Sequence, residues 1–116
     1  MIYRIGRLIC VMIIFIMFCE DSKKIILSHS FKNNSTYIIE AKGYPKDGIN
    51  NPIQKMASAR SAAEINAQTF ARTIFTSSID PIKNGYTKNI IMKSDHAIVT
   101  YIIQHKTLKK CIKKRN

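Results

Sequence analysis

The chain has 116 residues, a net charge of +12 and a hydrophobic content of 46%. A chain of this length forms one domain rather than two, and this hydrophobic content excludes a protein that is disordered throughout. Of the 19 lysines and arginines, two precede an apolar run at the start and six lie in the last eleven residues. The excess positive charge is therefore mainly a property of the C-terminal segment.

The first 19 residues have the layout of an export signal. Arg4 and Arg7 precede the uncharged apolar run 8–18, and a basic start followed by roughly 7–15 apolar residues is typical of secretory signals. A membrane-spanning helix needs about 20 apolar residues, so this run is short for one. We expect residues 1–19 to act as a signal peptide or a short membrane anchor that directs the protein out of the cytoplasm.

Cys19 directly follows this run, at the place where a lipoprotein signal carries its acylated cysteine. Such signals have a small residue before the cysteine, whereas Phe18 precedes it here. Three outcomes are open for the leader, namely lipidation at Cys19, retention as an uncleaved anchor, or ordinary cleavage. The first two attach the protein to a membrane, at the outer membrane or on the periplasmic face, and the third leads to secretion.

Two strands are predicted after the leader. Residues 25–31 are rich in isoleucine, and residues 36–42 alternate in character so that Tyr37, Ile39 and Ala41 share one face. The cluster of asparagine and serine between the two runs is typical of a turn. We therefore expect these strands to pair as a hairpin.

The strongest local prediction is a helix from Pro52 to about Phe75. Asn51 is a good N-cap, proline suits the first helical position, and Arg60 and Glu64 are spaced to form an ion pair. Apolar residues recur along the helix at steps of three and four, which indicates that one side packs against the rest of the protein. Small residues in this stripe allow a close approach. The stripe consists of Met56, Ala59, Ala63, Ala67, Phe70 and Ile74.

A loop over residues 76–88 leads to two further predicted strands, 89–93 and 97–105, with a turn at 94–96. The order strand-strand-helix-strand-strand predicts an α+β fold over residues 20–105, in which the long helix covers one face of a small antiparallel sheet. The other face also carries apolar residues. Two interpretations are open. Either a partner, such as a second copy or another envelope protein, covers this face, or the isoleucines lie on the surface only because isoleucine is abundant in the chain. These residues are Ile38, Ile98 and Ile102.

Residues 106–116 are expected to form a basic tail. Two interpretations are open, a solvated terminus or a surface that binds anionic lipid or another polyanion. We expect the tail to be dispensable for folding, with the reservation that Leu108 and Ile112 are four residues apart and are able to dock on the sheet. The candidate contacts for an anionic partner are Lys106, Lys109, Lys110, Lys113, Lys114 and Arg115.

Two segments, residues 40–45 (EAKGYP) and 56–67 (MASARSAAEINA), resemble the bacterial Lpp-twenty lipoprotein family and the related N-terminal domain of the flagellar assembly protein FlgT. The shared pattern is a strand that ends in glycine, then a loop, then an alanine-rich helix. The resemblance implies an envelope lipoprotein or envelope-associated module without catalysis. The matching residues are Gly43, Met56, Ala57, Ala62, Ala63, Asn66 and Ala67.

No local pattern predicts catalysis. His29, His96 and His105 are scattered, without paired carboxylates or metal-ligand spacing. We therefore expect no enzymatic activity, metal, cofactor or small-molecule substrate. The tyrosines do not alternate with basic residues as in a stacking platform, which argues against nucleic acid as a partner.

The leading hypothesis is a small cell-envelope protein, membrane-attached and with a structural or interaction role, that associates with itself or with another envelope component. The alternative is a basic peripheral binding module whose C-terminal tail contacts anionic lipid or nucleic acid.

Overall fold

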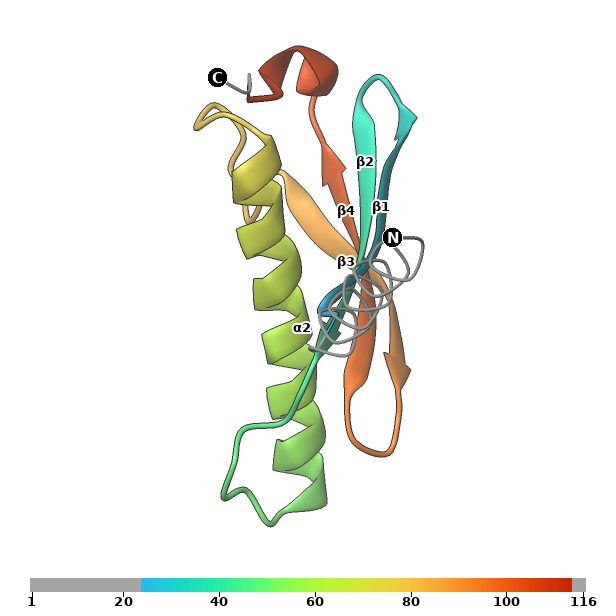
Figure 1. Cartoon of the computed structure of the whole chain (residues 1–116), viewed down its shortest axis with the longest axis vertical. Coiled ribbons are helices and arrows are strands. Elements are labelled where there is room, and N and C mark those ends of the chain that lie inside the picture. The colour runs from blue at the N-terminus through green and yellow to red at the C-terminus, as the bar shows by residue number, and fades with distance from the viewer. Residues whose placement is uncertain (1–23, 114–116) are drawn as a thin grey trace, which may run out of the picture.

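The computed structural model describes residues 24–113, so the leader, Cys19, Lys114 and Arg115 lie outside the described residues. Within them, four antiparallel strands form one sheet in the order β1-β2-β4-β3, and the helix α2 packs on one face of it (Figure 1). The predicted α+β class and element order are confirmed. The elements are β1 (Ile26–Asn33), β2 (Thr36–Gly43), α2 (Pro52–Ile74), β3 (Gly85–Met92), β4 (Ala97–Gln104) and the short 3-10 helix η1 (Leu108–Cys111).

The helix α2 begins and ends close to the predicted residues. The Asn51 side chain accepts hydrogen bonds from the backbone N–H groups of Ile53 and Gln54, at 2.9 and 3.3 Å, and so caps the first turn. Pro52 occupies the first helical position, where the N–H group that it lacks has no helical partner. At the other end Phe75 leaves the helix in an extended conformation with its side chain buried. Local capping chemistry therefore sets where the helix starts.

Alanines form the side of α2 that meets the sheet. Ala59, Ala63, Ala67 and Ala71 are buried, and a repeated four-residue step advances by about 40° around a helix of 3.6 residues per turn. The buried stripe therefore drifts around the helix axis. Met56, which the sequence assigns to the stripe, is 49% exposed. The predicted stripe is confirmed in its middle and wrong at Met56.

Small residues let α2 approach β2 closely. A Cβ atom added at Gly43 would lie 2.7 Å from the Cα atom of Ala63 and would also collide with the carbonyl oxygen of Ala59. Beside this contact the side-chain amide of Asn66 donates a hydrogen bond to the carbonyl oxygen of Lys42, at 2.9 Å. Three residues of the resembling pattern thus have a structural role, because they dock the helix on β2.

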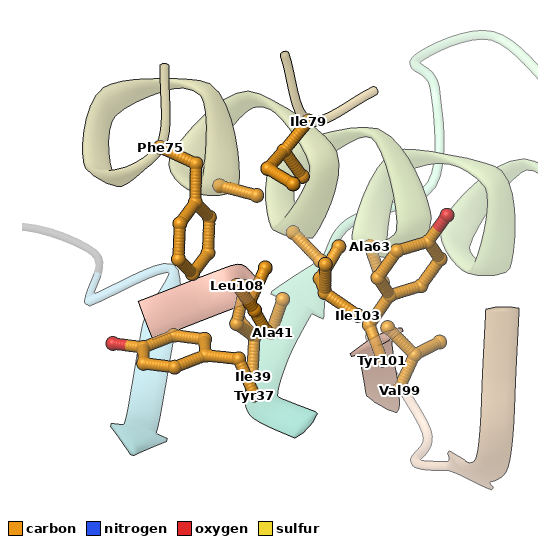
Figure 2. Close-up of a cluster of buried hydrophobic side chains, with 12 residues drawn as sticks. Tyr37, Ile39, Ala41, Ala63, Phe75, Ile79, Val99, Tyr101, Ile103 and Leu108 are labelled. Atoms are coloured by element: carbon orange, nitrogen blue, oxygen red, sulfur yellow. The ribbon is translucent and has the colours of Figure 1, made fainter. Parts of the chain in front are cut away.

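Aromatic and branched side chains fill the space between α2 and the sheet. The alternate residues of β2 that were predicted to share a face are buried beneath the helix, together with alternate residues of β4 (Figure 2). The ring of Phe75, just after α2, meets that of Tyr37 edge to face, with 5.3 Å between centroids. The two central strands therefore supply most of the sheet's side of the core. These residues are Tyr37, Ile39 and Ala41 on β2 and Val99, Tyr101 and Ile103 on β4.

The opposite face of the sheet carries the predicted isoleucines, which differ in exposure, together with polar residues such as the paired Glu40 and Thr100. Ile38 pairs with Ile102 across the central strands, and Ile102 is only 3% exposed. Ile38 and Ile98 are half-buried. The large exposed apolar side chains of this face are Tyr86 and Ile91, both on the edge strand β3.

The strand β3 begins at Gly85, earlier than the sequence predicts. Gly85 pairs with Ile103, and a Cβ atom added there would lie 2.5 Å from the Tyr101 ring. The added atom would also collide with the carbonyl oxygen of Pro81 in the turn just before the strand, so glycine is required by the close approach of both this backbone oxygen and the Tyr101 ring. A bulge between Thr87 and Asn89 breaks the alternation that identifies a strand in a sequence. This explains why the predicted strand starts only at Asn89.

The segment after β4 belongs to the folded domain. Leu108 is fully buried in the core. The backbone N–H of Thr76 donates to the carbonyl oxygen of Cys111, and that of Lys113 donates to the carbonyl oxygen of Ile74, both at 2.7 Å. The segment therefore ties the end of the sheet to the end of α2. The expectation of a tail that is dispensable for folding is corrected by these contacts, and the reservation about Leu108 is confirmed.

Leu108→Ala is expected to lower the free energy of unfolding by about 3 kcal/mol, because truncating a fully buried leucine leaves a cavity. Ile112→Ala is the matched control. Ile112 is 40% exposed, so the loss should stay below about 1 kcal/mol. Denaturant unfolding followed by circular dichroism measures both variants. Equal unfolding midpoints would contradict the docking of this segment through Leu108.

Candidate functional site

The segment after β4 carries the lysines that were predicted to contact an anionic partner. The backbone N–H of His105 donates to the carbonyl oxygen of Ser35 at 3.0 Å, and that of Lys109 donates to the carbonyl oxygen of Asn34 at 3.3 Å. These bonds hold the segment against the β1–β2 turn. In η1 the side chain of Leu108 is buried, while the neighbouring lysines are exposed. One buried leucine thus determines which side chains face the solvent.

Three of these lysines meet at one groove of about 370 Å³, which lies between η1 and the β1–β2 turn. We call it the basic groove. The residues that line it include three lysines, an asparagine and a threonine, and no acidic residue. Ammonium groups and neutral hydrogen-bond donors together suit a ligand with negatively charged oxygen atoms, such as a phosphate group. The lining residues are Asn34, Lys106, Thr107, Lys109 and Lys110.

Lys109 is oriented within the basic groove by two contacts. Its Nζ atom lies 5.7 Å from the ring centroid of Phe31 and 3.5 Å from Oδ1 of Asn34. Both contacts are weak, since the hydrogen bond is long and a cation–π contact at an exposed site contributes about 0.5–1 kcal/mol. Lys106 and Lys110 are exposed. All three lysines of the groove are therefore exposed, and Lys109 in addition makes these two weak contacts.

The other predicted contacts are not at the basic groove. Lys113 lines a neighbouring hollow of about 610 Å³, together with Arg72, Thr76 and Asp80. The carboxylate of Asp80 makes this hollow less positive than the basic groove. The two remaining cationic candidates at the C-terminus and the lipidation candidate Cys19 lie outside the described residues, so the structure does not place them.

The β1–β2 turn contributes to the groove in a way that the sequence does not predict. Asn34 is recognisable only as a turn residue, and Phe31 only as a strand residue. Neither shows a periodic relation to Lys109, which is separated from Asn34 by 75 positions. The pairing of β1 with β2 and of β2 with β4 brings these residues together.

The pKa values of Tyr37, Tyr101 and Asp95 are shifted, and these residues lie outside the basic groove. Burial raises the pKa of Tyr37 and of Tyr101. A hydrogen bond between His96 Nδ1 and Asp95 Oδ1, at 2.6 Å, lowers the pKa of the exposed Asp95 carboxyl group. His29 has a different partner, the Tyr37 hydroxyl group at 2.5 Å. The histidines are therefore spread over the fold rather than gathered in one site.

The carboxylate of Glu64 has a structural role. It lies 3.5 Å from Arg60, which confirms the predicted ion pair, and it accepts a hydrogen bond from the Thr87 hydroxyl group at 2.5 Å. One turn further along α2, the Gln68 amide donates to the hydroxyl group of Tyr101 at 3.2 Å. These contacts link the helix to β3 and β4 at the side of the core.

Histidine, cysteine and acidic side chains are dispersed over the described part of the chain. Within residues 24–113, no three of them are grouped so that they would hold a metal ion. The helices in this same range include none with the length and apolar character required to span a membrane.

Comparisons of the chain with protein-family models, with curated proteins and with solved structures find no match. The resemblance to the Lpp-twenty family and to the FlgT N-terminal domain therefore stays a prediction. The residues that carry it are explained in this structure by helix docking, through Gly43, Ala63 and Asn66.

Proposed function

We propose that this protein is a small, non-catalytic interaction module of the cell envelope, held at a membrane by residues 1–19. Attachment is supported by the order of residues in the leader, where Arg4 and Arg7 precede the apolar run 8–18 and Cys19 follows it. Either lipidation of Cys19 or retention of the leader would keep the folded domain at the membrane surface.

We further propose that the domain contacts an anionic envelope component through the basic groove. The observation that carries this proposal is the meeting of Lys106, Lys109 and Lys110 at one hollow without a carboxylate in its lining. A solvated, compositionally biased end would need no such arrangement, and here the buried Leu108 fixes the lysine-bearing segment against the sheet. Fixed charges lose less conformational freedom on binding than those of a disordered tail.

The test compares two triple variants of equal charge. In the groove variant the three lysines of the basic groove are replaced by alanine. In the control variant three exposed lysines far from the groove are replaced, so the net charge falls by the same amount. Two of them, Lys55 and Lys93, line a hollow beside the start of α2, and the third is Lys46.

Full-length protein in neutral detergent micelles is titrated with dextran sulfate, a simple polyanion. Binding by the unmodified chain should weaken as salt is added, because the contact is electrostatic. The groove variant should bind at least about tenfold more weakly than the control variant, because each lysine close to an anionic surface contributes about 1 kcal/mol and about 1.4 kcal/mol is tenfold in affinity. Equal affinity of the two variants would contradict the proposed site, and circular dichroism of both shows that they are folded.

A further inference from the structure

The start of β1, where the leader joins the domain, and the basic groove lie far apart. β1 leads from Ile26 to Asn33, next to the basic groove at the β1–β2 turn. Its other end is fixed beside the end of β2, where the backbone N–H of Lys42 donates to the carbonyl oxygen of Ile25 at 2.7 Å. A strand of eight residues spans roughly 26 Å. Figure 1 shows η1 and the β1–β2 turn together at one end of the molecule.

The chain between the leader and the domain is short. Only the five residues from 20 to 24 separate Cys19 from Ile25, and the six steps that join these two residues reach at most about 22 Å when fully extended. This reach is less than the length of β1. With Cys19 held at a membrane and β1 perpendicular to it, the basic groove lies on the side away from that membrane.

The end of the domain around the basic groove combines positive charge with exposed apolar side chains. Ile112 directly follows η1 and is 40% exposed, and Ile82, in the loop that leads to the start of β3, is 59% exposed. Lys83 and Lys113, both exposed, follow these two isoleucines in the sequence. Lysines that attract lipid phosphates, together with apolar side chains that enter the headgroup region, are the chemistry of proteins that bind anionic bilayers.

We propose that the basic groove binds the phosphate headgroups of a second anionic membrane, so that the protein links two lipid surfaces. This inference rests on the proposed function, because it requires both attachment through the leader and an anionic contact at the groove. It adds the identity of the partner and its position opposite the anchoring membrane.

The test uses full-length protein in donor vesicles of neutral phosphatidylcholine. Acceptor vesicles of phosphatidylglycerol or of phosphatidylcholine are added, and their recovery with the donors is measured by fluorescence. We expect recruitment of phosphatidylglycerol vesicles only. The groove variant should need on the order of a hundredfold more acceptor lipid, from roughly a fivefold step for each of the three lysines, whereas the control variant should resemble the unmodified chain.

Each other outcome contradicts a defined part of the proposal. Loss of the protein from the donor vesicles in a high-salt wash would contradict the membrane attachment, and with it the proposed function. Retention with binding of dextran sulfate but not of phosphatidylglycerol vesicles would leave the proposed function intact and overturn the lipid partner. Recruitment that disappears when phosphatidylglycerol is present in the donor vesicles themselves would show that the groove binds its own membrane. Equal recruitment by both variants would exclude the basic groove.

Discussion

Gly43→Ala is expected to lower the free energy of unfolding by about 3 kcal/mol or more, one of the largest effects of any single methyl group in this chain. The added Cβ atom would lie 2.7 Å from the Cα atom of Ala63 and would also meet the carbonyl oxygen of Ala59. These are backbone atoms of a helix, so no side chain can rotate to relieve the collision. Either α2 moves away from β2 and opens the core, or the variant unfolds.

Gly48→Ala is the control for this substitution. Gly48 has a φ angle of 85°, and a methyl group added there would have no heavy atom within 4 Å beyond its chain neighbours. Alanine there is strained only in its backbone, by about 1–2 kcal/mol. Thermal unfolding of both variants measures the difference. If Gly43→Ala is no less stable than Gly48→Ala, the helix does not lie as close to β2 as described.

A charge placed beneath α2 should have the second large effect. Ala63 and Ala67 are fully buried, so glutamate at either position would bring a carboxylate into the core without a partner, at a penalty of several kcal/mol. We expect both variants to lack a cooperative unfolding transition. Thr69→Glu introduces the same side chain at an exposed position of the same helix and should unfold nearly as the unmodified protein does.

Near-ultraviolet circular dichroism, which reports the packing of aromatic side chains such as the buried Tyr37 and Tyr101, complements the thermal data for these three variants. A native spectrum for Ala67→Glu would show that the packed face of α2 has been misidentified. Loss of the near-ultraviolet signal in Thr69→Glu would also show that the packed face of α2 has been misidentified, because Thr69 would then have to be buried.

The parts of the fold that the sequence predicts are those with a simple period or a local capping signal. Tyr37, Ile39 and Ala41 alternate along β2, and Asn51 followed by Pro52 marks the start of α2. Each of these signals depends on neighbouring residues alone, so it can be recognised in the sequence without knowledge of the tertiary structure.

Tertiary contacts between distant residues determine the features that the sequence does not predict. The bulge after Thr87 hides the start of β3, and the role of Gly85 depends on the ring of Tyr101. The spacing of Leu108 and Ile112 raises the possibility of docking, but the full burial of Leu108 depends on a core built by earlier elements. The lysines of the candidate site were identified from composition, but their arrangement around Asn34 follows from this docking alone.

Lysine footprinting tests most directly whether an anionic partner binds at the basic groove. The full-length protein is acetylated under limiting conditions with and without dextran sulfate, and the modification of each lysine is read by mass spectrometry. Protection is predicted to concentrate on Lys106, Lys109 and Lys110, while Lys55 and Lys93 keep their reactivity. Uniform protection of all lysines, or protection only at the far end of the molecule, would contradict a site at the groove.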